Sequence, residues 1–218
     1  YPVNEFHNLP KPQIFNTFNK YYDFFLEREK PETDWEAYTP YEVRAIGSFI
    51  FLDQPDRAHH LIDYFLKAQR PDGWNHWAEV VWKDYRTPRF IGDMPHTWVG
   101  SDFINAARAL FIYENEYDSS LVIGAGLKKD WIDYDKGISI ENLYNNYGTL
   151  SYSVKKSGSE YKFKIWGEMK KPNGGIIIKN FNDKKLPSAF LVNGIESNNF
   201  NENSIHIDKF PADIIIKY

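Results

Sequence analysis

The sequences HTWVGSDFINAARALFIY (residues 96–113) and LVIGAGL (residues 121–127) decide the fold, because the hydrophobic pattern changes between them. In the first, Val99, Phe103, Ala106 and Leu110 recur at steps of three and four, which is the period of a helix. From residue 121 onward, short apolar runs are separated by Gly, Asn, Pro and Lys clusters, as in strands joined by turns. We therefore predict an α+β fold, with a helical domain at residues 1–118 and a β-sandwich-like domain at residues 119–218.

Three segments ahead of residue 96 share the helical period, and they cover residues 13–28, 39–52 and 58–69. Thr39 followed by Pro40 predicts an N-cap with proline at the first helical position. The short break at Asp53-Gln54-Pro55 predicts an antiparallel pair of helices. Together with the helix at 96–113, these segments make four helices arranged as hairpins.

The β part contains eight short segments with the pattern of strands. They cover residues 121–123, 137–140, 149–154, 161–166, 175–179, 189–192, 204–207 and 212–217. This spacing predicts an antiparallel sandwich or half-barrel.

Composition excludes several classes of protein. The 218 residues carry a net charge of −4, which argues against a nucleic-acid-binding protein, and no apolar run approaches the length of a membrane span. The absence of cysteine excludes a disulfide scaffold, a thiolate zinc site and a cysteine nucleophile. The chain opens on Tyr1-Pro2 without an initiator methionine or a signal peptide, so we expect a processed protein or an excised piece.

Charge and aromatic residues are unevenly divided along the chain. Residues 1–118 hold 12 basic and 19 acidic side chains, whereas residues 119–218 hold 14 basic and 11 acidic ones. Five of the seven Trp and five of the six His also lie in the first part. Two compositions of this kind indicate two domains.

The two long connections between the predicted helices, residues 29–39 and 70–95, should emerge at the same end of an up-and-down bundle. They carry Asp34-Trp35-Glu36-Ala37-Tyr38 and Trp74-Asn75-His76-Trp77-Ala78-Glu79. Loops on a rigid scaffold are common places for binding and catalytic residues. We therefore expect one rim of the helical domain to hold the functional site.

Tryptophan beside carboxylates suits saccharide chemistry. A Trp face can pack on the C–H face of a pyranose, while two carboxyl groups can cleave a glycosidic bond as acid and as base or nucleophile. Glu36, Glu79 and Asp93 are the candidate carboxylates; alternatively, each is a solvated or helix-capping acid. Arg89 and His96 could bind sugar hydroxyls or hold Asp93 ionised, or they could form a salt-bridged loop.

Other chemistries lack their sequence signals. No HxxxH or HExxH spacing, no glycine-rich phosphate loop and no GxSxG elbow is present. Adjacent His59 and His60 point to different faces of a helix, which disfavours a shared metal. We expect no cofactor and no metal.

Several stretches taken together resemble a known family. They are GWNHWAEV (residues 73–80), PRFIGDMPHTWV (88–99), LVIGAGL (121–127) and YGTLSYS (147–153). They look like the C-terminal end of bacterial six-hairpin glycosidase-like proteins, large secreted or periplasmic chains that often carry discoidin-type (coagulation factor 5/8-like) modules. The superfamily has an (α/α)6 toroid, commonly followed by a β-domain, and includes rhamnosidases and disaccharide phosphorylases.

The resemblance implies that the chain is a C-terminal fragment, since a full toroid needs twelve helices and four long ones are predicted. It favours Glu79 as a catalytic carboxylate, with Asp93 and His96 lining the pocket and Trp74, Trp77 and Trp98 as sugar platforms. Trp35, Glu36, His76 and Arg89 complete the expected saccharide site. The missing helices of the parent polypeptide and a saccharide are the expected partners, and the fragment alone should be inactive.

Three functions remain open from the sequence. The parent could be a glycoside hydrolase, the chain could be a non-catalytic carbohydrate-binding module, or the β-domain could be purely structural and cover the apolar flank of the toroid. If neighbouring helices are missing, the predicted helices at 13–28 and 96–113 should expose apolar surface.

Overall fold

The computed structural model describes residues 5–70, 73–84, 93–182 and 185–218. The chain divides into two compact units, Tyr1–Ala109 and Leu110–Tyr218, which we call the helical unit and the β unit. This boundary lies ahead of the one at Asp118 that composition indicated. Within the described residues, none of the helices combines the length and the apolar character that crossing a bilayer requires.

The new boundary changes the distribution of charge. The helical unit contains 12 basic and 16 acidic residues, and the β unit contains 14 of each. Glu114, Glu116 and Asp118 belong to the β unit and balance the positive charge that residues 119–218 carry on their own. The whole net charge of −4 therefore resides in the helical unit.

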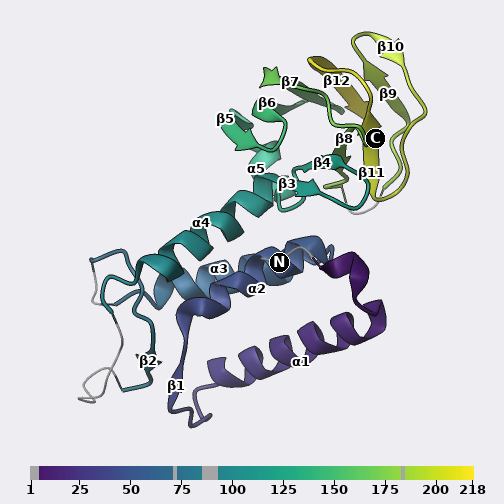
Figure 1. Ribbon diagram of the computed structural model, residues 1–218. Helices are drawn as coiled ribbons and strands as arrows, with labels where there is room; N and C mark the ends of the chain where they lie inside the picture. Colours follow the sequence, from purple (N-terminus) through teal and green to yellow (C-terminus); the bar gives the residue numbers. More distant parts are fainter. Residues whose placement is uncertain (1–4, 71–72, 85–92, 183–184) are drawn as a thin grey trace. The chain divides into compact units, whose positions relative to one another are not determined.

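The helical unit is built from helices and one short two-stranded ladder (Figure 1). Its elements are η1 (Phe6–Asn8), α1 (Lys11–Glu29), β1 (Ala37–Tyr38), η2 (Pro40–Val43), α2 (Arg44–Phe51), α3 (Pro55–Lys67), β2 (Val81–Trp82) and α4 (Thr97–Phe111). The four predicted helices are thus present, with ends that differ by a few residues.

The segment predicted as one helix over residues 39–52 is divided in two. It starts as the 3₁₀ turn η2, in which the Glu42 N–H donates to the Thr39 carbonyl at 3.1 Å, and continues as α2. The Thr39 hydroxyl accepts the N–H of Tyr41 at 3.4 Å, so the predicted capping role of Thr39 is confirmed. The 3₁₀ turn η2 contains Tyr41 and Glu42 and directly follows the long connection at residues 29–39.

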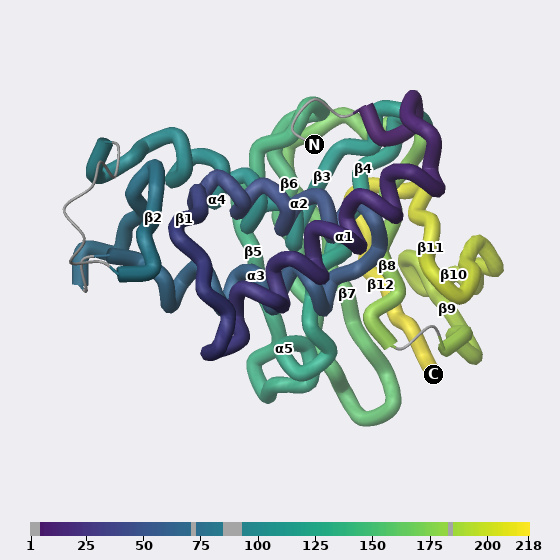
Figure 2. Tube along the Cα trace, turned by 90° about the horizontal axis from the view of Figure 1, so that it is seen from below, coloured from purple at the N-terminus to yellow at the C-terminus, as the bar shows by residue number. Residues whose placement is uncertain are grey.

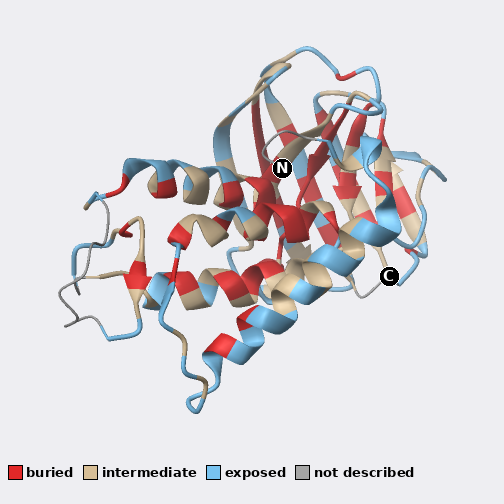
Figure 3. Ribbon diagram, turned by 60° about the horizontal axis from the view of Figure 1, so that its bottom comes forward, coloured by how far each residue is buried: buried red, intermediate tan, exposed pale blue. Residues whose placement is uncertain are grey.

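Aromatic side chains join α1 to the antiparallel pair α2 and α3. Phe18 and Tyr22 each place their ring centroid 5.7 Å from that of Phe49 on α2, and Phe25 lies 5.0 Å from Tyr64 on α3. These three helices lie side by side in two perpendicular views (Figures 1 and 2). Figure 3 shows that α1 is buried only near its C-terminal end, whereas most of α2 is buried, from Ile46 to Ile50.

The β unit consists of two sheets and a short helix. Its elements are β3 (Ile112–Asn115), β4 (Ser120–Ile123), α5 (Lys129–Asp133), β5 (Ile138–Asn145), β6 (Gly148–Ser157), β7 (Glu160–Met169), β8 (Ile176–Lys179), β9 (Ala189–Val192), β10 (Ile195–Glu196), β11 (Ser204–Ile207) and β12 (Ala212–Lys217). One sheet has the order β10-β9-β12-β7-β6-β5 and the other the order β11-β8-β4-β3.

Both sheets contribute to one apolar core. Leu121 and Ile178 of the four-stranded sheet and Tyr152 and Phe163 of the six-stranded sheet belong to the same buried cluster. On strands such as β7 and β12 the buried positions alternate with accessible ones, as the period of two requires. The predicted α+β class and the sandwich-like packing of the sheets are therefore confirmed at this level.

Three features depart from the predicted pattern. The helix predicted to reach Tyr113 ends at Phe111, because Ile112 pairs with Ile123 in a strand that the helical period concealed. The pair β4–β8 is parallel rather than antiparallel, which the long intervening stretch of β5 to β7 permits. The helix α5 lies in a segment for which no helix is predicted.

Candidate functional site

The two long connections of the helical unit meet at one rim, as predicted. Ala37 pairs with Trp82 and Tyr38 with Val81 in the ladder between β1 and β2. Beyond this ladder, the Thr39 hydroxyl donates to the carbonyl oxygen of Glu79 at 2.9 Å. These bonds join the segment that contains Trp35 and Glu36 to the segment that contains Glu79.

Trp77 anchors this rim to the core. Its side chain is 5% exposed, its indole N–H donates to the Phe65 carbonyl at 2.8 Å, and its ring centroid lies 4.7 Å from that of Phe103. The sequence had suggested a sugar platform, but the ring offers no accessible face to a ligand. Burial of an indole with a satisfied N–H is the usual arrangement for a core tryptophan.

Other tryptophans of the rim remain accessible. Trp74 is 60% exposed and Trp98 is 69% exposed. Trp35 is half-buried and contacts Tyr38 edge to face, with ring centroids 5.6 Å apart. Trp74 and Trp98 therefore provide open aromatic surface, and their role as sugar platforms stays a prediction.

His96 connects the rim to the start of α4. It is 7% exposed, and its backbone N–H donates to the Trp77 carbonyl at 3.1 Å. Its Nε2 lies 2.7 Å from the Tyr41 hydroxyl, and its Nδ1 lies 4.0 Å from Oδ2 of Asp93. The imidazole thus lies between a phenol and a carboxylate and can interact with both.

Tyr41 is the central residue that sequence reasoning missed. Partial burial raises its pKa, and the negative charges of Glu79, Asp102 and Asp93 act in the same direction, while Arg44 opposes them. The Arg44 guanidinium carbon lies 4.5 Å from the Tyr41 ring centroid, and Arg44 Nε donates to Asp102 at 2.7 Å. The phenol therefore stays protonated at neutral pH and can donate its proton to Nε2 of His96.

The η2 turn that carries Tyr41 is fixed from the other side by a buried ion pair. The guanidinium of Arg28, with its side chain 2% exposed, donates to both carboxylate oxygens of Glu42 at 2.8 and 2.6 Å. Tyr21 donates to the same carboxylate at 2.8 Å. Tyr41 and Glu42 are neighbours, so the pair holds Tyr41 in place for its contact with His96.

The remaining candidates are distributed around this centre. Glu79 is half-buried, Glu36 is exposed, and the carboxylate of Asp93 is 90% exposed. Nδ1 of His76 accepts the backbone N–H of Trp77 at 2.9 Å, so His76 shapes the loop. Arg89 lies outside the described residues.

The arrangement brings together a phenol, an imidazole and several carboxylates beside an exposed tryptophan. The Trp98 ring centroid lies 6.1 Å from that of His96. Such a set can bind hydroxyl groups and can transfer protons. Among the described residues, no group of three His, Asp or Glu side chains could hold a metal ion.

In comparisons with protein-family models, curated proteins and solved structures, the chain has no significant match.

Proposed function

We propose that the chain is the C-terminal part of a secreted or periplasmic carbohydrate-active protein. In this proposal the helical unit contributes the last hairpins of an (α/α)6 toroid of the six-hairpin glycosidase-like kind. Its rim forms part of a site that binds a saccharide and cleaves a glycosidic bond.

The observation that carries the proposal is the position of His96, 2.7 Å from the Tyr41 hydroxyl and 4.0 Å from the Asp93 carboxylate, at the rim where Thr39 bonds the backbone of Glu79. Glu79 serves as a catalytic carboxylate, and Asp93 is its candidate partner in acid–base chemistry. Tyr41 and His96 position these groups and bind sugar hydroxyls. Trp98 supports the saccharide through its exposed ring.

Exposed apolar side chains support the proposal of further helical hairpins. Phe24 on α1 is 61% exposed, and Ile104 on α4 is 68% exposed. A pocket of about 370 Å³ between η1, α1 and α2 is lined by Leu9, Phe18 and other largely apolar residues. Additional hairpins of the parent chain would cover such surfaces in a closed toroid.

The cleavage proposal is tested by Glu79→Gln in the longer chain that includes the missing hairpins. The substitution keeps the shape of the side chain but removes its acid–base function, so we expect reducing-sugar release from polysaccharide to fall by a factor of about 10²–10⁴. Glu116→Gln, an exposed change in the β unit, should leave the rate unchanged. Full activity in the Glu79 variant would show that this carboxylate is not catalytic.

A non-catalytic binding function is the second candidate, and the exposure of Asp93 favours it. The Asp93 carboxylate is 90% exposed, so it can accept hydrogen bonds from the hydroxyls of a bound saccharide. Under this alternative the rim binds a saccharide without cleaving it.

Binding by the 218-residue chain tests whether the rim holds a saccharide. If the rim binds saccharide, Trp98→Ala should weaken the affinity for glycans on an array, whereas Ile104→Ala, on the same helix and equally exposed, should have no effect. Equal losses in both variants would indicate a general disturbance of α4. Binding that persists through both would place the ligand elsewhere.

A further inference from the structure

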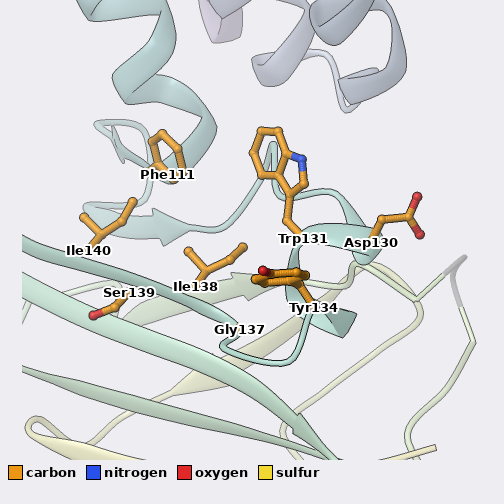
Figure 4. A pocket seen from close by; sticks show the side chains of 8 residues that line it. All are labelled: Phe111, Asp130, Trp131, Tyr134, Gly137, Ile138, Ser139 and Ile140. Atoms are coloured by element: carbon orange, nitrogen blue, oxygen red, sulfur yellow. The ribbon is translucent and has the colours of Figure 1, made fainter.

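A pocket in the β unit is separate from the rim and has its own aromatic lining. Its volume is about 450 Å³, within the range of roughly 300–1,000 Å³ that is typical of small-molecule sites. Its walls are formed by Phe111, Trp131, Tyr134, Ile138 and Ile140, and Asp130 lies at its edge. Figure 4 shows Trp131 and Tyr134 on one side and the two isoleucines with Phe111 on the other.

The two aromatic residues of the pocket that come from α5 and its end are more exposed than the isoleucines opposite them. Trp131 is 38% exposed and Tyr134 is 64% exposed, whereas Ile138 and Ile140 are half-buried. Both rings belong to one turn, because α5 ends at Asp133 and Tyr134 follows it. Ile132 is fully buried in the core, so α5 turns the adjacent Trp131 away from the core. Tyr134 directly follows the helix and is exposed.

The aromatic wall is held rigidly. The carboxylate of Asp133 bonds Lys129, accepts the Tyr161 hydroxyl at 2.9 Å and lies 3.2 Å from the Lys156 ammonium. These bonds tie α5 to β6 and β7. A rigid aromatic wall loses little conformational entropy when a ligand binds.

The opposite wall is fixed by backbone geometry. The Phe111 carbonyl accepts the Gly124 N–H at 2.9 Å and the Tyr152 hydroxyl at 3.0 Å. Gly137, with φ +66°, turns the chain from α5 into β5, and a Cβ at this position would lie 2.2 Å from the Val154 carbonyl oxygen. Only glycine fits this turn, which sets the spacing between Tyr134 and Ile138.

We propose that this pocket binds a neutral saccharide. Aromatic faces can pack on the C–H face of a sugar ring, and the Tyr134 hydroxyl, which Figure 4 shows on the side of Ile138, can bond a sugar hydroxyl. The charges beside Trp131 balance: Asp130 is its neighbour in the sequence, and the Lys128 ammonium lies 5.8 Å from its ring centroid. This balance favours an uncharged sugar over a uronate or an amino sugar.

The proposal concerns the β unit and is independent of cleavage at the rim. It is tested with the 218-residue chain and a panel of neutral oligosaccharides, namely cellohexaose, xylohexaose, mannohexaose and maltohexaose, with polygalacturonate as the charged probe. Binding is measured by tryptophan fluorescence and by calorimetry. We expect at least one neutral oligosaccharide to bind and polygalacturonate to bind more weakly.

Variants assign the binding to this pocket. Trp131→Ala and Tyr134→Ala should each weaken the affinity for the bound oligosaccharide about tenfold or more, and Trp131→Phe should retain part of it. The matched control Tyr144→Ala removes a tyrosine of β5 that is 79% exposed and is not among the residues that line this pocket, and it should leave this affinity unchanged. Circular dichroism and thermal unfolding show whether each variant is folded, and exposed positions of this kind tolerate substitution.

Three results would overturn the proposal. They are the absence of binding to every neutral oligosaccharide at millimolar concentration, tighter binding of polygalacturonate, and binding that survives both Trp131→Ala and Tyr134→Ala. A loss in the Trp98 variant alone would support the rim as the saccharide site and would contradict this pocket.

Discussion

At the scale of single residues, the rim depends on contacts between side chains that are far apart in sequence. Tyr41 and His96 are separated by more than fifty positions, yet their hydroxyl and Nε2 lie 2.7 Å apart. No periodicity in the sequence indicates such a pair. The residue types Glu79, Asp93 and His96 could be selected from composition, but Tyr41 could not, because one tyrosine among 15 carries no distinguishing signal.

Tyr41→Phe tests the contribution of this contact. The ring and its packing remain, but the hydroxyl that faces His96 is lost, so the free energy of unfolding should fall. Urea denaturation measures the change. Tyr117→Phe, at a position 76% exposed, should change stability by less than about 0.5 kcal/mol. Equal stability of the Tyr41 variant and the original chain would mean that the contact adds nothing to folding.

The ion pair beneath Tyr41 should have a larger effect. Arg28→Met leaves the Glu42 carboxylate buried with its main partner removed, which costs roughly 3–5 kcal/mol. The double variant Arg28→Met with Glu42→Leu removes both charges, and its loss should be smaller than that of Arg28→Met alone. Chemical denaturation of the set gives the coupling energy. A double variant that is less stable than either single one would show that packing, rather than charge, dominates here.

At the scale of elements, the sequence predicted most helices and strands, and the misses have physical causes. The period of three and four located α1 to α4, and the period of two located most strands of the sandwich. It missed the short β1–β2 ladder, because pairing with a strand distant in the sequence decided these segments. It missed β3 because this strand follows α4 directly and continues its helical period. It also assigned Trp77 to the surface, since the bond from its indole to the Phe65 carbonyl is a tertiary contact.

The hydrogen bonds of Asp133, which tie α5 to the sheet, predict how stability depends on pH. Partial burial alone would raise the pKa of Asp133, but hydrogen bonds from Lys129, Tyr161 and Lys156 outweigh it and lower the pKa below its usual value. The stabilisation is therefore present above the unfolded-state pKa of about 3.9 and is lost as the pH falls through the folded-state pKa.

Asp133→Asn should reduce the free energy of unfolding by about 1–2 kcal/mol at pH 6. Near pH 3 the difference between the variant and the original chain should shrink. Urea denaturation at the two pH values measures it, with Asp135→Asn as the exposed neighbouring control. A difference that is constant across this range would mean that Asp133 acts through its shape rather than its charge.

At the scale of the whole molecule, the two units differ in net charge, and the large apolar cluster lies in the β unit. The net charge of the chain resides in residues 1–109, while residues 110–218 are balanced. The residues of the large apolar cluster, from Ile112 to Ile216, all belong to the β unit. A segment that contains its own complete core can fold alone, and a chain of about 100 residues is a common size for such a domain.

We therefore predict that residues 110–218, produced alone, fold cooperatively and remain monomeric. Two-state urea unfolding followed by circular dichroism and tryptophan fluorescence tests this, because Trp131 and Trp166 report from this unit only. All residues of the proposed saccharide pocket lie within this segment, so it should bind the same neutral oligosaccharide with unchanged affinity. A folded segment without binding would show that the pocket needs the helical unit, whereas an unfolded segment would show that the core of the β unit is insufficient by itself.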